Sequence, residues 1–204
     1  SLPQNKIKEI IVVNNGSTDK TAYIAKEHGA RVVDEAHRGY GAACLKGIME
    51  LNEPEIVVFL DGDFSDFPEE IESLVNPIIN NQADFVIGSR MLLPQSRVSL
   101  LPQARYGNLL AVFLINLLFR HQFTDLGPFR AIRYKSLKEL NMLDKNFGWT
   151  VEMQIKAIKH GLLIKEVPVQ YRKRIGVSKI TGTISGTIKA GIKIIFTIFK
   201  YLLV

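Results

Sequence analysis

The segment Glu55 to Glu70, which reads EIVVFLDGDFSDFPEE, places the strongest constraint on how this chain can fold. Ile56 to Leu60 is a continuous apolar run rich in β-branched residues, which is typical of a strand buried on both faces of a parallel sheet. The run ends in Asp61-Gly62-Asp63, and Pro68 then opens a helix. The segment therefore predicts a buried strand, a polar turn and a helix, which is an α/β arrangement.

The two carboxylates of this turn have two interpretations. Asp61 and Asp63 follow a buried strand, where negative charge is costly unless something positive lies nearby. Ligands of open α/β sheets bind at this end of the strands, and carboxylate oxygens suit Mg²⁺ or Mn²⁺. We expect Gly62 to let the backbone bend so that both carboxylates converge on one ion. The alternative is a polar strand-to-helix turn in which an Asp caps the helix.

Composition limits the class of protein. A chain of 204 residues with 47% hydrophobic content can bury a full core, and one large domain is expected. The single cysteine, Cys44, excludes an internal disulfide and a cysteine-rich metal site, which fits a reducing compartment. The chain begins at Ser1 without an initiator Met or an apolar signal sequence. We therefore do not expect secretion, and we expect the chain to be a fragment.

Charge is distributed unevenly along the chain. Residues 50–90 hold ten acidic residues and one basic residue, whereas residues 165–200 hold eight basic residues and one acidic residue. The second region has a net charge of +7, which exceeds the +6 of the whole chain. This pattern predicts a ligand or surface that carries phosphates. No basic run is interleaved with stacking aromatic residues, so we expect no nucleic acid partner and favour an anionic membrane face.

Strand and helix patterns alternate through most of the chain, which predicts a doubly wound, mostly parallel sheet. The predicted strands are 7–13, 30–33, 56–60, 84–87, part of 123–134, and 162–171, with Pro168 indicating an edge position. The predicted helices are 20–28, 42–51, 68–80, 149–160 and 183–204, and 91–102 is expected to be a loop.

One uncharged helical segment has two interpretations. Tyr106 to Phe119 is fourteen residues without a formal charge, which is shorter than the roughly 20 residues needed to span a bilayer. It is either a core helix or a helix that contacts a membrane. The helix predicted at 183–204 places Lys189, Lys193 and Lys200 among apolar residues, so it could lie in a membrane interface or cover the sheet.

Seven motifs occur in order over about 170 residues: IVVNNGSTDKT, RGYGAACLKG, FLDGDFSDFPEEI, DFVIGSR, TDLGPFRAIR, EVPVQYRKR and GVSKI. Together they resemble the family 2 inverting glycosyltransferases. Within that family they are similar to the branch of dolichol-phosphate mannose synthase and its bacterial polyprenyl-phosphate relatives. The resemblance implies a Rossmann-like, A-type glycosyltransferase fold, with a catalytic domain over residues 1–180 and a basic amphipathic helix over 181–204.

The resemblance also implies an activity: inverting transfer of a sugar from a UDP- or GDP-linked donor to dolichyl or undecaprenyl phosphate. The enzyme would act at the cytoplasmic face of the membrane with Mg²⁺ or Mn²⁺. Asp61 and Asp63 would form the DxD pair that holds the cation on the donor diphosphate. The turn of Asn15, Gly16 and Ser17 would line the nucleoside pocket.

Further residues follow from the same resemblance. Arg90 would face the phosphates of donor or acceptor, and Asp125 and Arg130 would lie in a TDxxxxFR motif beside the transfer site. Asp125, Arg130 and Asp63 are the implied catalytic residues. The acceptor-phosphate loop would contain the basic and hydroxyl residues Arg174, Ser178 and Lys179.

The chemistry fits this assignment. Charge develops on the leaving nucleoside diphosphate, where a cation and fixed arginines stabilise it. A lipid phosphate is largely ionised at neutral pH and needs no strong base. We therefore expect Asp125 to orient the metal or an arginine, with an ordinary loop aspartate as the alternative. Glu152 has two interpretations, a family acidic position or a solvated helix face.

The chain also departs from the family pattern. It has neither the family's first strand, which normally lies mid-sheet, nor the Pro-x-x-Asn-Glu turn that follows it. Asn14 and Asn15 replace a turn that usually carries an Asp, and Tyr40 and Ser65 stand where relatives often have Lys and Gln. Two alternative functions therefore stay open. They are a glycosyltransferase with a soluble or polysaccharide acceptor, and a non-catalytic remnant that binds a nucleotide or a membrane partner.

Overall fold

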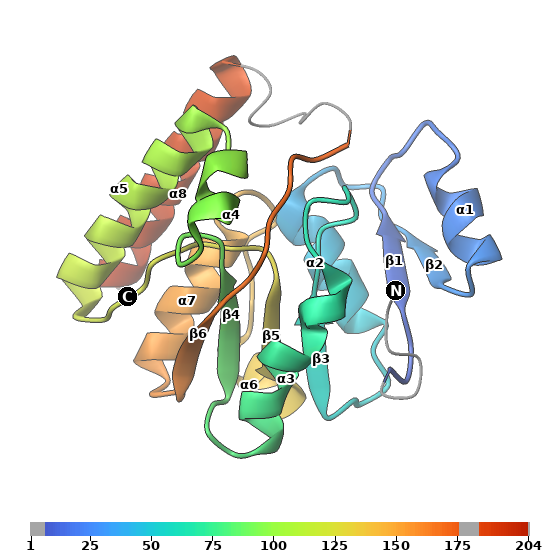
Figure 1. The fold of residues 1–204 in the computed structure, drawn as a ribbon, viewed down its shortest axis with the longest axis horizontal. Coiled ribbons are helices and arrows are strands. Elements are labelled where there is room, and N and C mark those ends of the chain that lie inside the picture. Colours follow the sequence, from blue (N-terminus) through green and yellow to red (C-terminus); the bar gives the residue numbers. More distant parts are fainter. Residues whose placement is uncertain (1–6, 176–183, 204) are drawn as a thin grey trace.

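The computed structural model describes residues 7–175 and 184–203, which form two sheets flanked by helices (Figure 1). The smaller sheet pairs β1 (Ile11–Asn14) with β2 (Arg31–Asp34) in parallel, and α1 (Thr21–Glu27) connects them. Helix α2 (Tyr40–Met49) follows and packs against β1. The parallel pairing with a helical crossover agrees with the alternating pattern of the sequence.

The larger sheet has the strand order β3-β5-β4-β6. Its strands are β3 (Ile56–Phe59), β4 (Phe85–Ser89), β5 (Arg130–Arg133) and β6 (Ile164–Pro168). Strand β5 is antiparallel to both of its neighbours, so β3, β4 and β6 run in one direction. β6 forms an edge, as Pro168 indicated. Among the described strands, β1 and β3 are not paired with each other, so the sheet is divided between them.

Helices cover both faces of the larger sheet. A 3-10 turn, η1 (Pro68–Glu70), leads into α3 (Ile71–Ile79), whose Leu74 and Ile78 pack against Val86 on one face. Phe85 and Ile87 point to the opposite face, as alternate residues of a strand must. There they join the main core with residues of α5 (Pro102–Phe119), α7 (Trp149–Lys159) and α8 (Ile184–Leu203). The α/β class and the C-terminal helix are thus confirmed.

Two helices were not expected. The segment 91–102, predicted to be a loop, contains α4 (Pro94–Ser99), so that prediction was wrong. Pro94 occupies a favourable first position, and the buried Ser96 hydroxyl donates a hydrogen bond to the Val169 carbonyl at 3.0 Å. Helix α6 (Tyr134–Leu140) directly follows β5 and was also missed. Both helices are short, so contacts with the core decide their conformation more than local propensity does.

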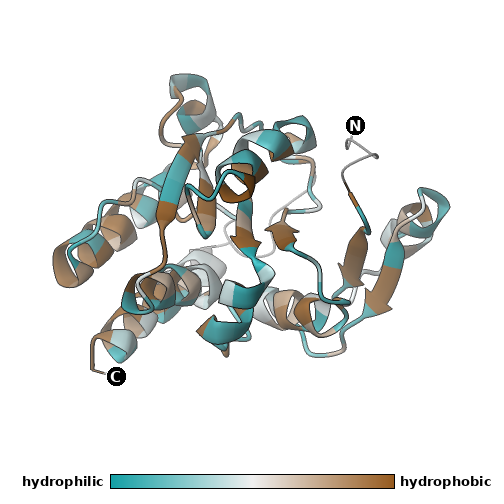
Figure 2. Cartoon of the chain, turned by 90° about the horizontal axis from the view of Figure 1, so that it is seen from below, coloured by the Kyte–Doolittle hydropathy of each residue, from teal (hydrophilic) through white to brown (hydrophobic). Residues whose placement is uncertain are grey.

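Helices α5 and α8 lie side by side at one end of the molecule (Figure 1). Ala111, Val112 and Ile115 of α5 are buried against the core, and so are Ile198 and Tyr201 of α8. The helix that ends at the C-terminus mixes hydrophobic and more hydrophilic residues along its length (Figure 2). Within the described residues, no helix is long and apolar enough to cross a membrane.

Candidate active site

Asp61 and its neighbours lie where β3 ends. Phe59 at the end of β3 pairs with Arg130 at the start of β5, and Ile87 near the end of β4 pairs with the same residue. The loops after β3 and β4 therefore leave the sheet at one edge. Burial, followed by the nearby charge of Asp63, raises the pKa of Asp61 to about 6.

Asp63 is the better satisfied carboxylate of the pair. Its Oδ1 accepts hydrogen bonds from the backbone N–H of Ser65 at 3.0 Å and from the Ser65 hydroxyl. Its Oδ2 lies 3.1 Å from Nη2 of Arg174. Gly62 and Asp63 lie in a turn, and the left-handed residue of this loop is Phe64, with φ of 68°. A bulky residue in this conformation stores strain, which is a recurrent feature of functional loops.

Asp66 is a third acidic group of the same loop, residues 61–66, which we call the acidic loop. Sequence reasoning did not assign Asp66 to the site. Its side chain is buried, and Oδ2 accepts a hydrogen bond from the backbone N–H of Asp61 at 3.3 Å. Oδ1 is buried without a hydrogen-bond partner in the described part of the chain. Burial and the charge of Asp61 raise the pKa of Asp66 to about 7. The spacing DxDxxD was the sequence signal that could have found it.

These acidic groups fit a cation. Three carboxylates share one loop, two have raised pKa values, and one buried oxygen lacks a partner. Across residues 7–175 and 184–203, however, no three His, Cys, Asp or Glu side chains are grouped closely enough to hold a metal ion alone. Mg²⁺ is commonly bound through one or two carboxylates and completed by water and substrate phosphates. Asp61 and Asp63 could hold a cation in that way.

Arg90 and Asp125 form a buried ion pair beside this loop. Nε and Nη2 of Arg90 donate to Oδ2 and Oδ1 of Asp125, each at 2.8 Å, and the Arg90 backbone N–H donates to Oδ2 at 2.8 Å. The Asp125 side chain is fully buried and that of Arg90 is 13% exposed. Burial disfavours the charge of Arg90, but Asp125 outweighs this and raises the pKa of the guanidinium. The positive charge of Arg90 partly offsets the burial that raises the pKa values of Asp61 and Asp66.

Glu166 of β6 fixes the loop that carries Asp125. Its carboxylate accepts hydrogen bonds from the backbone N–H groups of Thr124 and Asp125 and from the Thr124 hydroxyl, at 2.8 to 3.1 Å. The Gln154 amide of α7 donates to the Asp125 carbonyl at 3.1 Å. Sequence reasoning missed both residues, because they lie in ordinary strand and helix patterns far from the TDxxxxFR motif.

Arg130 lies beneath the same loop and is fully buried. Its guanidinium donates to the carbonyls of Gly127, Leu126 and Thr150, and it lies over the rings of Phe85 and Trp149. Burial lowers the pKa of Arg130 to about 10, so the group stays charged at neutral pH. The resemblance implied a catalytic role for Arg130. In the structure its hydrogen bonds hold the backbone that follows Asp125.

The predicted nucleoside turn joins two loops of the smaller sheet. The Asn15 amide donates to the carbonyls of Glu35 and His37, and its Oδ1 accepts from the Gly39 N–H at 2.8 Å. Gly16 has φ of 72°, which favours glycine, and the Ser17 N–H donates to the Asn14 side chain. Helix α2 begins next to Gly39, and a hydrogen bond from its Tyr40 to Asp61 partly offsets the burial that raises the pKa of Asp61. The turn is thereby connected to the acidic loop.

The basic segment that follows β6 also reaches the acidic loop. Arg174 contacts Asp63, and the guanidinium of Arg172 lies 3.3 Å from the ring centroid of Phe64. Ser178 and Lys179 fall outside the described residues. Glu152, by contrast, is fully buried, so the solvated-face interpretation was wrong. It accepts hydrogen bonds from the backbone N–H groups of Leu143 and Asp144, in the segment before α7, and from the Tyr201 hydroxyl, which ties α7 to α8.

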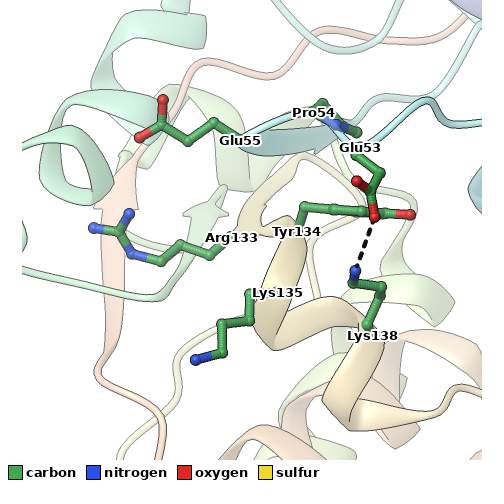
Figure 3. A pocket seen from close by; sticks show the side chains of 7 residues that line it. All are labelled: Glu53, Pro54, Glu55, Arg133, Tyr134, Lys135 and Lys138. Carbon is green, nitrogen blue, oxygen red and sulfur yellow. Dashed lines mark hydrogen bonds and ion pairs between the residues drawn. The ribbon is translucent and has the colours of Figure 1, made fainter.

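A separate hollow of about 350 Å³ opens at the other end of β3 (Figure 3). Glu53, Pro54 and Glu55 line it from the segment before that strand, together with residues of β5 and α6. Lys138 pairs with Glu53 at 3.4 Å across this hollow. None of the predicted site residues lines it, so it is distinct from the acidic loop.

Comparison with known proteins agrees with this geometry. The family model described as glycosyl transferase family 2 matches residues 2–140. An uncharacterized glycosyltransferase of Mycobacterium bovis is 33% identical over 181 residues, which is 88% of this chain and 81% of the relative. A dolichyl-phosphate hexose transferase of Haloferax volcanii is 32% identical over 174 residues, which is 83% of this chain and 73% of the relative.

The fold has solved counterparts. Glucosyl-3-phosphoglycerate synthase of Mycobacterium tuberculosis, in a complex with Mn²⁺, UDP-glucose and phosphoglyceric acid, superposes with a TM-score of 0.75. The match covers 97% of this chain and 70% of the other, at 21% sequence identity. This confirms the A-type glycosyltransferase fold. The family model and the relatives together show that the chain is a glycosyltransferase and belongs to glycosyl transferase family 2.

Proposed function

We propose that the enzyme transfers a sugar from a nucleoside-diphosphate donor to a polyprenyl phosphate, with the help of Mg²⁺ or Mn²⁺. The proposal rests on one observation: the acidic loop and the Arg90–Asp125 ion pair lie close together at one edge of the sheet. A site with opposite charges side by side suits a cation and phosphates together. Such a site suits a non-catalytic remnant less well, because a remnant has no need of a buried, bidentate arginine.

The donor side consists of the acidic loop and the Asn15 turn. Asp61 and Asp63 would hold the cation, which when bound neutralises charge that develops on the leaving diphosphate. Asn15, Gly16 and Ser17 would line the nucleoside pocket, and the hydrogen bonds of Asn15 already fix the loops around it. Arg90 would stabilise a phosphate oxygen through the donors that Asp125 leaves free.

The acceptor side needs orientation more than a base. An ionised phosphate oxygen attacks the anomeric carbon from the face opposite the leaving group, which inverts the configuration. Both oxygens of Asp125 accept hydrogen bonds from Arg90, so its role would be to aim that arginine. Arg174 would contact the acceptor phosphate, and Ser178 and Lys179 would complete that loop. The H. volcanii relative, by its name, acts on dolichyl phosphate.

The exposed faces of α5 and α8 support a lipid acceptor. The large apolar side chains exposed on these adjacent helices include Leu109, Leu110, Phe113, Leu117, Ile188, Ile192, Phe196 and Phe199. Lys189 and Lys200 are exposed among them. Apolar residues combined with cations are typical of helices that rest in an anionic membrane interface. We propose that this pair of helices contacts the cytoplasmic face of the membrane.

A soluble phosphorylated acceptor is the second candidate. The superposed glucosyl-3-phosphoglycerate synthase structure contains phosphoglyceric acid beside UDP-glucose, and a phosphate group is common to both kinds of acceptor. The exposed apolar faces of α5 and α8 favour the lipid, because a soluble acceptor gives them no partner.

Calorimetric titration tests the donor half of the proposal. UDP and GDP are titrated, with and without Mn²⁺, into the wild type and into the double variant Asp61→Ala/Asp63→Ala. We expect binding of one nucleotide that depends on Mn²⁺ and is lost in the variant, and the tighter nucleotide identifies the donor. Binding that is equally strong in the variant would contradict the assignment of Asp61 and Asp63.

A further inference from the structure

The segment after β6 runs along the acidic loop like an added strand. Tyr171 forms an antiparallel bridge with Asp66, and the Arg172 N–H donates to the Ser65 carbonyl at 2.9 Å. The Ile175 N–H donates to the Asp63 carbonyl at 3.0 Å. We call residues 171–175 the basic segment. It covers the loop that would hold the donor cation, so whatever binds this loop meets the basic segment.

Arg174 is the residue of this segment that neutralises Asp63. Its Nη2 lies 3.1 Å from Oδ2, and the two side chains are 35% and 14% exposed. Nε of Arg174 is buried and has no hydrogen-bond partner in the described residues. A buried guanidinium N–H without an acceptor costs free energy that an anion could recover. Arg174 therefore pairs with Asp63 through Nη2, while its Nε–H has no acceptor.

The acidic loop, by contrast, lacks positive partners for most of its carboxylates in the described part of the chain. Two further arginines lie close to it. Arg172 donates to the backbone carbonyls of Phe64 and Asp66. Arg90 is held by Asp125 and cannot move onto Asp63 without leaving a fully buried carboxylate alone. Oδ1 of Asp66 is buried and lacks a partner among the described residues. Among the described residues, Arg174 is thus the arginine whose guanidinium pairs directly with a carboxylate of this loop. A divalent cation would supply the charge that is missing, while the spare donor of Arg174 calls for an anion.

We propose that Arg174 is an exchangeable counter-ion, which a divalent cation displaces from Asp63 and which then binds a phosphate oxygen. This inference rests on the proposed cation site at Asp61 and Asp63. The exchange couples the two ligands, because the cation frees the arginine that the phosphate needs. By reciprocity, a phosphate that engages Arg174 strengthens cation binding by the same factor.

The test is calorimetric titration of Mn²⁺ alone, without nucleotide, into the wild type, Arg174→Gln and Lys173→Gln. Lys173 lies in the same segment, is exposed, and loses the same charge, so it is the matched control. Because Arg174→Gln lacks the competing ion pair, its affinity for Mn²⁺ should be about two- to fivefold higher than that of the wild type. The Mn²⁺ affinity of Lys173→Gln should stay near the wild-type value. Mn²⁺ binding that is unchanged, weaker or absent in Arg174→Gln would overturn the exchange.

A second titration measures the coupling. The factor by which Mn²⁺ strengthens UDP or GDP binding should be smaller in Arg174→Gln than in Lys173→Gln. An equal factor in the two variants contradicts the exchange and leaves the proposed transferase function standing. If the wild type itself shows no Mn²⁺-dependent binding of UDP or GDP, the proposed function is contradicted instead.

Discussion

The Asp125 carboxylate accepts three hydrogen bonds from Arg90, one each from Nε, Nη2 and the backbone N–H, and all three distances are 2.8 Å. The pair joins the end of β4 to the loop before β5, and Glu166 holds that loop from β6. Three elements far apart in sequence thus position one guanidinium beside the acidic loop. A bidentate geometry leaves the arginine little freedom, which is what a group that stabilises developing charge requires.

Asp125→Asn should damage both activity and stability. The neutral amide cannot accept both guanidinium hydrogen bonds, and a nearly buried Arg90 loses its counter-charge. We expect the free energy of unfolding to fall by about 3 kcal/mol and kcat to fall by about 100-fold or more. Urea denaturation and a sugar-transfer assay measure the two effects.

Glu53→Gln is the control for that variant. Glu53 pairs with Lys138 at 3.4 Å on the surface, and both side chains are largely exposed. A surface pair of this kind contributes little, so the control should match the wild type in both assays. An Asp125→Asn enzyme with wild-type kcat would contradict the positioning role of Asp125.

Tyr201→Phe should loosen the attachment of α8. The Tyr201 hydroxyl donates to Oε1 of the buried Glu152 at 2.6 Å, which links α8 to α7. Removing it should lower the free energy of unfolding by about 1 to 2 kcal/mol, because Glu152 loses a charge-assisted hydrogen bond. Tyr23→Phe removes a similar bond to Glu27 on the exposed surface and should leave Tm unchanged. Equal Tm values for the two variants would show that α8 does not depend on this bond.

Asp66 should make stability depend on pH in a defined direction. Its pKa of about 7 in the folded protein exceeds the ordinary value of 3.8, so the folded state binds the proton more tightly. The stability that this proton contributes is present at low pH and is lost as pH rises through about 7. Asp61 contributes in the same direction up to about pH 6.

Asp66→Asn isolates this effect, because amide and protonated carboxyl have the same shape. In buffer with EDTA, the variant should gain about 2 to 3 kcal/mol relative to the wild type between pH 5 and pH 8. Urea denaturation of both proteins at the two pH values measures it. The groups that set this pKa, including Asp61, Asp63 and Arg90, stay in place in both proteins. A stability difference that does not change with pH would show that Asp66 is already ionised at pH 5.

The double variant Phe113→Ser/Phe196→Ser should weaken membrane binding. Both side chains are 60% exposed, one on α5 and one on α8. Co-sedimentation with vesicles that contain anionic lipid should fall at least about tenfold, since each loss removes apolar area from the interface. Val98→Ser, on α4 and 77% exposed, is the matched control and should bind like the wild type. Unchanged co-sedimentation of the double variant would exclude these helices as the membrane contact.

The sequence predicted the elements whose signals are local. The apolar run Ile56 to Leu60 and the turn after it correctly indicated β3 and the acidic loop, and Pro168 indicated an edge strand. The reversed direction of β5 could not be read, because strand direction depends on which neighbours it pairs with and not on its own pattern. α4 was missed because its six residues are held by contacts such as that of Ser96 with Val169.

The candidate site divides in the same way. Motifs indicated Asp61, Asp63, Arg90 and Asp125, which the fold brings to one edge of the sheet. Asp66, Glu166 and Gln154 were missed, because their importance comes from burial and from partners far away in the sequence, such as Tyr171 for Asp66 and Thr124 for Glu166. Arg130 belongs to a motif, yet its full burial against backbone carbonyls could be learned only from the packed structure.

Transfer of labelled sugar tests the central claim most directly. The enzyme, with Mn²⁺, is incubated with UDP- or GDP-linked labelled hexose and either undecaprenyl phosphate in vesicles or 3-phosphoglycerate in solution. We predict that label enters the organic phase with the lipid phosphate, and that Asp61→Ala/Asp63→Ala abolishes this transfer. Label that passes only to 3-phosphoglycerate, or transfer to lipid that survives in the double variant, would contradict the account.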